Sequence, residues 1–237
     1  GLLYLIFWFV LCRWIIGYQK FSSWNALVLV IFWMGMNFII PMTGNILIQK
    51  LIPVKEGLQA QIEQREGYHN KWDEAKIPTM QKFHRIYPQF SQYTVAENSG
   101  YSYTWYYAMQ HMADVESEKS SKLYHDKMLR RNNAAVYLGY ILPNIQTQLV
   151  QSEIAKTGME NQLNYAEGLK NFHEKQRLYF YPSIFENLNG NTIDWSKQTV
   201  KTFTDSGKPN LLGVFLPYII FISLFLILSQ IKFRKLC

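Results

Sequence analysis

Cysteine is nearly absent from this 237-residue chain, which contains only Cys12 and Cys237. Neither lies in the long polar stretch of residues 49–209, so this stretch can hold no disulfide framework and no thiolate metal site. A domain of about 160 residues can bury a core without such cross-links. We therefore expect residues 49–209 to fold around apolar packing alone.

Signatures of enzymes and nucleotide-binding proteins are also missing. The chain has no GxSxG nucleophile motif, no HExxH zinc motif, no GxxxxGK[ST] phosphate loop and no GxGxxG dinucleotide motif. Its carboxylates mostly neighbour lysine or arginine, as in ESEKSSK and HEKQR, which is typical of solvated helix faces. We therefore expect no catalytic residues, no cofactor and no enzymatic activity.

Histidine is the remaining candidate metal ligand. His111 and His125 are fourteen residues apart, which corresponds to about 21 Å along a helix, so one helix cannot bring them together. A zinc site needs three or four converging ligands, and the other histidines, His69, His84 and His173, show no supporting spacing. We expect exposed or hydrogen-bonded histidines and no metal site.

Charge is missing from two long segments. Trp24 to Ile48 comprises 25 residues without a charged side chain, and Leu211 to Ser229 comprises 19. Each is long enough to cross a bilayer core of about 30 Å at about 1.5 Å per helical residue. We therefore predict transmembrane helices over residues 24–48 and 210–231.

A shorter apolar segment, GLLYLIFWFVLC, opens the chain. It is too short to cross a bilayer alone, and no basic stretch precedes it as in a signal peptide. The chain also begins at Gly1 and not at methionine. We expect residues 1–16 to be the end of a truncated transmembrane helix and the chain to be a C-terminal fragment.

Basic residues flank the apolar segments. Residues 49–209 hold 19 Lys and Arg and all 17 Asp and Glu, so other residues supply most of the net charge of +7. These residues are Arg13, Lys20, Lys232, Arg234 and Lys235. By the positive-inside rule, residues 17–23 form a cytoplasmic loop and residues 232–237 a cytoplasmic tail. Residues 49–209 are then extracytoplasmic, and the excess charge does not indicate nucleic-acid binding.

Helical periodicity dominates residues 49–209, and strand-like alternation is scarce. We expect a bundle of four or five helices, with small strands near 85–100 or 185–205 as an open alternative. One helix is predicted to continue from the first span through a kink at Pro53, and another to stop before Pro182. The predicted fold class is mainly α, with transmembrane helices flanking a helical extracytoplasmic bundle.

The segment YSYTWYYAMQHMAD, residues 101–114, is the candidate site. We predict a helix from about Tyr103 to Arg131, on which Trp105, Met109 and Met112 face the core. A second line on this helix comprises Tyr103, Tyr107, His111 and Asp114. These four residues could form a buried polar network or line a pocket, and packing alone is the alternative.

Polar residues also recur inside the first predicted span. Asparagine is costly in hydrocarbon unless it is paired. The span contains Asn37 and Asn45 on either side of Pro41. We expect these three residues to serve helix packing, a translocation path or both.

Four motifs carry a resemblance to a known family. They are WDEAK at 72–76, KFHRIYPQF at 82–90, TWYYAMQHMAD at 104–114 and LKNFHEKQRLYFYPSIF at 169–185. With the flanking apolar segments, they resemble the C-terminal half of bacterial ABC-2 type transporter permeases. The group concerned has a large extracytoplasmic domain of unknown function, and the resemblance covers nearly the whole chain.

This resemblance implies a multi-pass permease subunit of an ATP-driven exporter in the bacterial cytoplasmic (inner) membrane. The implied partners are a cytoplasmic ABC ATPase subunit that hydrolyses ATP, a second permease subunit in a homo- or heterodimer, and the lipid bilayer. The resemblance assigns no catalytic residue. The alternative functions are a membrane-anchored extracytoplasmic ligand-binding or sensor module and a membrane-bound enzyme that uses the histidines.

Overall fold

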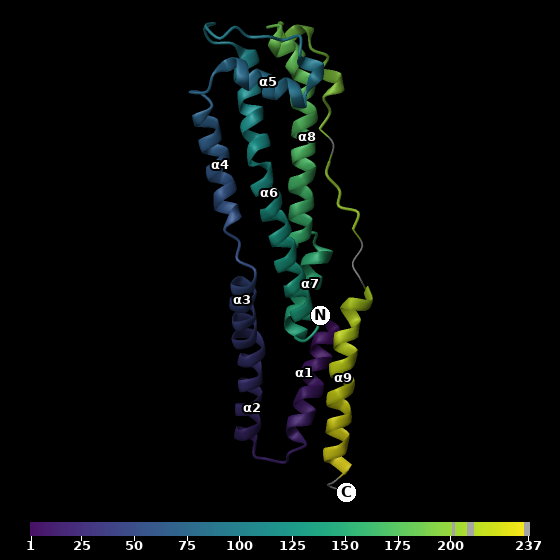
Figure 1. The fold of residues 1–237 in the computed structure, drawn as a ribbon. Coiled ribbons are helices and arrows are strands. Elements are labelled where there is room, and N and C mark those ends of the chain that lie inside the picture. The colour runs from purple at the N-terminus through teal and green to yellow at the C-terminus, as the bar shows by residue number, and fades with distance from the viewer. Residues whose placement is uncertain (201, 208–210, 235–237) are drawn as a thin grey trace. The chain divides into compact units, whose positions relative to one another are not determined.

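A computed structural model describes residues 1–200, 202–207 and 211–234 (Figure 1). Within these residues the chain forms helices and no strand, and two segments apolar enough to cross a membrane flank a helical region. The predicted mainly α fold class is therefore confirmed. In place of the strands that the sequence left open, the chain has short 3-10 turns: η2 (Pro88–Phe90), η3 (Gly190–Thr192) and η4 (Trp195–Lys197).

The chain divides into two compact units, each assembled from separate stretches of sequence. Unit 1 comprises residues 1–53, 129–162 and 205–237, and unit 2 comprises residues 54–128 and 163–204. Two helices contribute residues to both units: α6 (Tyr103–Gly139) and α8 (Met159–Phe185). Residues 129–162, which lie inside the predicted 49–209 domain, thus fold with the apolar segments.

Unit 1 contains two helical segments that could cross a membrane by length and composition, Ser22–Leu51 and Gly213–Arg234. They include the predicted spans 24–48 and 210–231 apart from residues 210–212, of which 210 lies outside the described residues. The second segment also contains the first residues of the predicted tail 232–237, whose residues 235–237 are not among those described.

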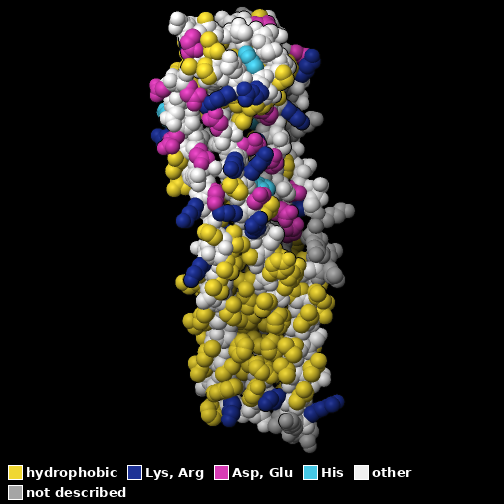
Figure 2. All heavy atoms as spheres, viewed as in Figure 1, with side chains coloured by type: hydrophobic (Ala, Val, Ile, Leu, Met, Phe, Trp, Pro, Cys, Tyr) yellow, Lys and Arg dark blue, Asp and Glu magenta, His cyan; other side chains and the backbone are white. Residues whose placement is uncertain are grey.

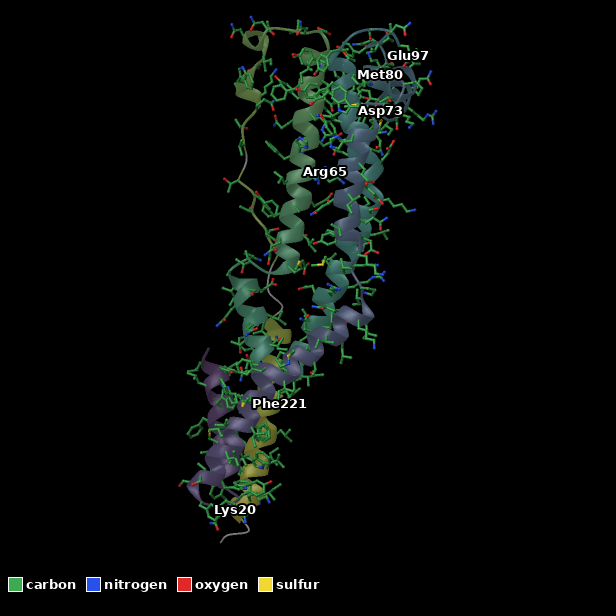
Figure 3. The ribbon with its side chains drawn as sticks, turned by 90° about the vertical axis from the view of Figure 1, so that its left-hand side faces the viewer. Lys20, Arg65, Asp73, Met80, Glu97 and Phe221 are labelled. Carbon is green, nitrogen blue, oxygen red and sulfur yellow. The ribbon has the colours of Figure 1, made fainter. Side chains whose placement is uncertain are left out.

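These segments are built from three labelled helices and one wide turn. The first joins α2 (Ser22–Met34) to α3 (Ile40–Leu51) through the π-helical turn η1 (Gly35–Ile39). The second lies in α9 (Leu211–Arg234). The shorter apolar helix α1 (Leu2–Ile16) packs against α9, where the ring centroids of Phe7 and Phe221 are 6.3 Å apart. Figure 3 labels Phe221 on α9.

The surface of unit 1 is apolar over these helices. Figure 2 shows hydrophobic side chains covering this face of unit 1, with Lys and Arg gathered at the end where α9 finishes. Large side chains such as Ile31, Phe38 and Ile227 are more than half exposed. An exposed apolar surface of this kind is typical of helices that contact lipid or another protein.

Pro41 accounts for the π-helical turn in the first segment. Proline has no N–H group, and its ring excludes the normal preceding helical turn. The N–H of Ile40 donates to the carbonyl of Gly35, five residues earlier, and Pro41 cannot extend this pattern to the carbonyl of Met36. The amide Nδ2 of Asn144 donates to that carbonyl instead.

Pro217 deprives a second carbonyl, in α9, of its usual helical N–H donor. The carbonyl of Gly213 lies four residues before Pro217, so it receives no helical N–H from that position. The Nε2 of Gln146 donates to this carbonyl at 2.9 Å. Asn144 and Gln146 both lie in the first turn of α7 (Pro143–Ile154) and are each 5% exposed. One short helix therefore supplies a side-chain donor to one carbonyl in each apolar segment.

Unit 2 is organised around the first part of α6 (Figure 1). The helix α4 (Glu56–Asn70) runs antiparallel to α6, since Glu56 pairs with Lys127 and Tyr68 with Tyr106. The helix α8 is also antiparallel to α6, because Lys170 bonds to Glu118 and Tyr181 to His111. The helix α6 thus contacts both α4 and α8 through its side chains.

The core of unit 2 is rich in aromatic and sulfur-containing side chains. Trp105, Met109 and Met112 are 4%, 0% and 2% exposed, so their predicted core placement is confirmed. They pack with Phe83 of α5 (Lys76–Ile86) and with Tyr181 of α8. This packing fixes the ends of three helices against one another.

Two predicted helix boundaries are wrong. The helix α8 does not stop before Pro182 but continues to Phe185, and the rings of Tyr181 and Phe185 stack with centroids 4.9 Å apart. Burial of these rings outweighs the loss of one helical hydrogen bond at the proline. No kinked helix passes Pro53, because α3 ends at Leu51 and α4 begins at Glu56.

Replacing Gln146 by alanine is expected to lower the free energy of unfolding of the full chain by about 1–3 kcal/mol, because it removes a buried amide that donates to the Gly213 carbonyl. Thermal or denaturant unfolding in detergent measures this change. The matched control is Gln148→Ala, since Gln148 is an exposed glutamine of the same helix. It should change stability by less than about 0.5 kcal/mol.

A Pro217→Ala background sharpens this test. Alanine restores an N–H that can bond to the Gly213 carbonyl, so the loss caused by Gln146→Ala should become smaller. An equal loss in both backgrounds would contradict the role of Gln146 as the donor to that carbonyl.

Candidate functional site: a buried histidine beside a cavity

Unit 2 contains a cavity of about 580 Å³ lined by α4, α6 and α8. Its polar wall includes Arg65 of α4, Asp114 of α6 and Arg177 of α8. Figure 3 marks Arg65 in unit 2. A volume of this size is within the range of about 300–1,000 Å³ that is usual for small-molecule pockets.

His111 forms part of the cavity wall and is only 2% exposed. Its Nδ1 is 3.0 Å from the hydroxyl of Tyr181. Its Nε2 is 2.8 Å from the hydroxyl of Tyr87 and 3.1 Å from Oε2 of Glu174. Tyr87 also donates to Oε1 of Glu174 at 2.8 Å. Both ring nitrogens therefore have partners.

Burial keeps this imidazole neutral. Burial lowers the pKa of His111 to about 4, and the nearby Arg177 guanidinium is the second cause. Burial also raises the pKa of Tyr87 and of Tyr181 above their ordinary values, so both phenols are protonated near neutral pH. The protons then have one consistent arrangement: Tyr181 donates to Nδ1, Nε2–H donates toward Glu174, and Tyr87 donates to Glu174.

Arg177 forms a second polar cluster, around Asp114. Its Nη2 lies 2.6 Å from Oδ2 of Asp114 and 3.1 Å from Nδ1 of His173. Gln64 donates to the other oxygen, Oδ1 of Asp114, at 3.0 Å. The Nη1 of Arg177 is buried and has no hydrogen-bond partner. Each oxygen of the Asp114 carboxylate thus has a partner, while Nη1 of Arg177 has none.

Comparison with known proteins gives one match. A family model described as a domain of unknown function, DUF3526, covers residues 57–204. The chain belongs to the DUF3526 family. The matched range contains every residue named in the histidine network and in the cluster around Asp114. No curated protein and no solved structure matches the chain.

The DUF3526 region brings three of the four candidate residues from the sequence to the cavity. Tyr107, His111 and Asp114 all line it. Tyr103 is the first residue of α6, is 51% exposed and packs on Tyr101 with ring centroids 5.3 Å apart. It therefore lies outside the cavity wall.

The candidate residues of the first apolar segment lie in unit 1. Asn37 is half-buried, and its Nδ2 donates to the Trp33 carbonyl at 2.9 Å. Asn45 is exposed, and its Oδ1 accepts from Gln49 at 3.3 Å. Both asparagines bond within their own segment. Pro41 cannot donate to the Met36 carbonyl, and Asn144 of α7 donates to it instead.

Four residues of the candidate site in the DUF3526 region were not predicted as site residues from the sequence: Tyr87, Glu174, Arg177 and Tyr181. The last three carried a signal, because they are spaced i, i+3 and i+7 and so share one face of a helix. Nothing in the sequence shows that this face meets His111. Over the described part of the chain, no group of three or more His, Cys, Asp or Glu side chains is placed to hold a metal ion.

The buried state of His111 predicts a pH dependence of stability. The pKa of His111 is about 4 in the folded chain and about 6.5 when unfolded, so only the unfolded chain takes up a proton between these values. The stability from the neutral imidazole is therefore fully present above pH ~6.5 and is lost as the pH falls toward about 4. Between pH 7 and 5 this loss is about 1–2 kcal/mol.

Denaturant unfolding at several pH values measures this dependence. His111→Gln should lose less stability than the unsubstituted chain between pH 7 and 5. His125→Gln, on the same helix and with a 36% exposed side chain, should keep the original profile. If His111→Gln also keeps that profile, the neutral buried state of His111 is refuted.

Proposed function

We propose that the chain is a permease subunit of an ABC-2 type ATP-driven transporter and exports its substrate across the bacterial cytoplasmic membrane. One observation carries the proposal. Each of the two apolar helical segments contains a proline, and α7 side-chain amides bond to a carbonyl on the turn before each proline. Prolines inside membrane helices are tolerated where neighbouring helices satisfy the freed carbonyls, which supports a multi-helix membrane protein such as a permease.

The helix α7 fits a re-entrant element in this proposal. It has 12 residues, which is too few to cross a bilayer core of about 30 Å. Its first turn is buried in unit 1 and bonds to both apolar segments. Short helices at membrane depth are tolerated where protein surrounds them.

The basic residues support one orientation. Arg13 lies in the last turn of α1, Lys20 in the connection to α2, and Lys232 and Arg234 in the last turn of α9. The positive-inside rule assigns these flanks to the cytoplasm. Unit 2, whose residues all lie between Leu51 and Leu211, is then extracytoplasmic.

The proposed partners follow from what such a permease requires. The chain has no phosphate-binding loop, so a separate cytoplasmic ABC ATPase subunit would hydrolyse the ATP. A second permease subunit and lipid would cover the exposed apolar side chains of α2, α3 and α9.

A second candidate is a membrane-anchored extracytoplasmic module that binds or senses a ligand. The cavity of about 580 Å³ in unit 2 favours this function, because polar and aromatic side chains converge on it. The two functions are compatible, since the extracytoplasmic part of a transporter can bind a ligand.

Purification from native membranes tests the transporter function. The tagged protein, cross-linked before mild detergent extraction, should bring with it an ATPase that contains a phosphate-binding loop. The uncross-linked complex should hydrolyse ATP in a vanadate-sensitive manner. An unrelated tagged multi-pass protein is the control. If no such ATPase is enriched over this control, the permease function is rejected.

A further inference from the structure

We propose that the cavity in unit 2 binds an organic anion, meaning a molecule with a carboxylate or phosphate group and an apolar body. Arg65 and Arg177 bind the anionic group, and aromatic side chains pack on the apolar body. All lining residues come from α4, α6 and α8 within unit 2. Binding here does not depend on the proposed transport function.

Positive charge exceeds negative charge in the cavity. Arg65 and Arg177 both line it, and Asp114 is the single carboxylate among the described lining residues. Glu174 is not part of the lining, and its two oxygens contact Tyr87 and His111. One guanidinium charge is therefore left without a carboxylate in the wall.

The two arginines also have unused hydrogen-bond donors. The Nη1 of Arg177 is buried without a partner, although Nη2 is bound to Asp114. No hydrogen bond or ion pair involves the Arg65 side chain within the part of the chain that the structure describes. Arg65 is exposed, so its donors are open to solvent, whereas the buried Nη1 of Arg177 lacks an acceptor, which is unfavourable. The oxygens of a carboxylate or phosphate match the donors of both guanidinium groups.

Aromatic rings make up much of the remaining wall. Tyr68, Tyr107, Phe180 and Tyr181 line the same cavity. Such rings bury large areas of an apolar ligand and leave their hydroxyls for polar contacts. A bare inorganic ion would fill only a small part of about 580 Å³. The lining therefore selects an anion with an apolar body.

The site is held in place before any ligand binds. Tyr181 is 1% exposed and is fixed by its bond of 3.0 Å to His111. Arg177 is oriented by its contact of 2.6 Å with Asp114, which Gln64 holds from the opposite helix. A preorganised site spends little binding free energy on ordering its side chains.

The binding test uses the full chain in detergent and isothermal titration calorimetry. The probes are 4-phenylbutyrate, the neutral 4-phenylbutanamide, dihexanoyl phosphatidic acid and inorganic phosphate. We expect at least one of the two organic anions to bind one molecule per chain. The amide and inorganic phosphate should bind at least about tenfold more weakly. Tighter binding of the phosphatidic acid identifies a lipid headgroup as the source of the anion, and tighter binding of the carboxylate identifies a free acid.

Arginine variants locate the bound anion. Arg65→Gln and Arg177→Gln should each weaken binding of the preferred anion by at least about tenfold. Arg85→Gln, the same change at an exposed position of unit 2 outside the cavity, should leave it unchanged. Arg65→Gln keeps the test valid if Arg177→Gln fails to fold. Equal binding of 4-phenylbutyrate and its amide with no phosphatidic acid binding, or full binding in Arg65→Gln, would overturn the proposal.

Discussion

A backbone carbonyl that a proline has deprived of its helical donor needs another donor wherever water is excluded. Unit 1 depends on this constraint. The carbonyls of Met36 and Gly213 receive side-chain amides from Asn144 and Gln146, which are two residues apart in one short helix. The hydroxyl of Tyr218 in turn donates to the Pro143 carbonyl at 2.8 Å. A side-chain bond can be exchanged without unwinding a helix, so in the proposed transporter these are the places where the apolar segments could bend.

Unit 2 meets a related constraint around α6. This helix presents His111 and Asp114 about one turn apart, and each organises a different polar group on α8. The histidine is satisfied as a neutral ring, whereas Asp114 holds Arg177 by one nitrogen and leaves the other unpaired. The proposed ligand therefore binds on the arginine side of the cavity, where a donor is unpaired, and not on the histidine side, where both ring nitrogens have partners.

The sequence allowed prediction of features that depend on local periodicity. The lack of charge located the apolar segments, and helical spacing turned Trp105, Met109 and Met112 to the core. Spacing also grouped Tyr107 with His111 and Asp114, but it could not show that Tyr103 lies outside the cavity. The partners on α8 are about sixty or more residues from α6 in sequence, so only the tertiary fold pairs them. Buried Asn144 and Gln146 were equally hidden, because amides beside a proline resemble an exposed helix start.

Labelling of single cysteines tests most directly whether the apolar segments cross a bilayer with unit 2 outside. Cys12 and Cys237 are first replaced by alanine, and Asn98→Cys in unit 2 and Lys20→Cys in the α1–α2 connection are then made separately. Both positions are exposed. We predict that a membrane-impermeant maleimide labels Asn98→Cys in spheroplasts and labels Lys20→Cys only after lysis. Labelling of both positions in intact spheroplasts, or of Lys20→Cys alone, would contradict the proposed topology.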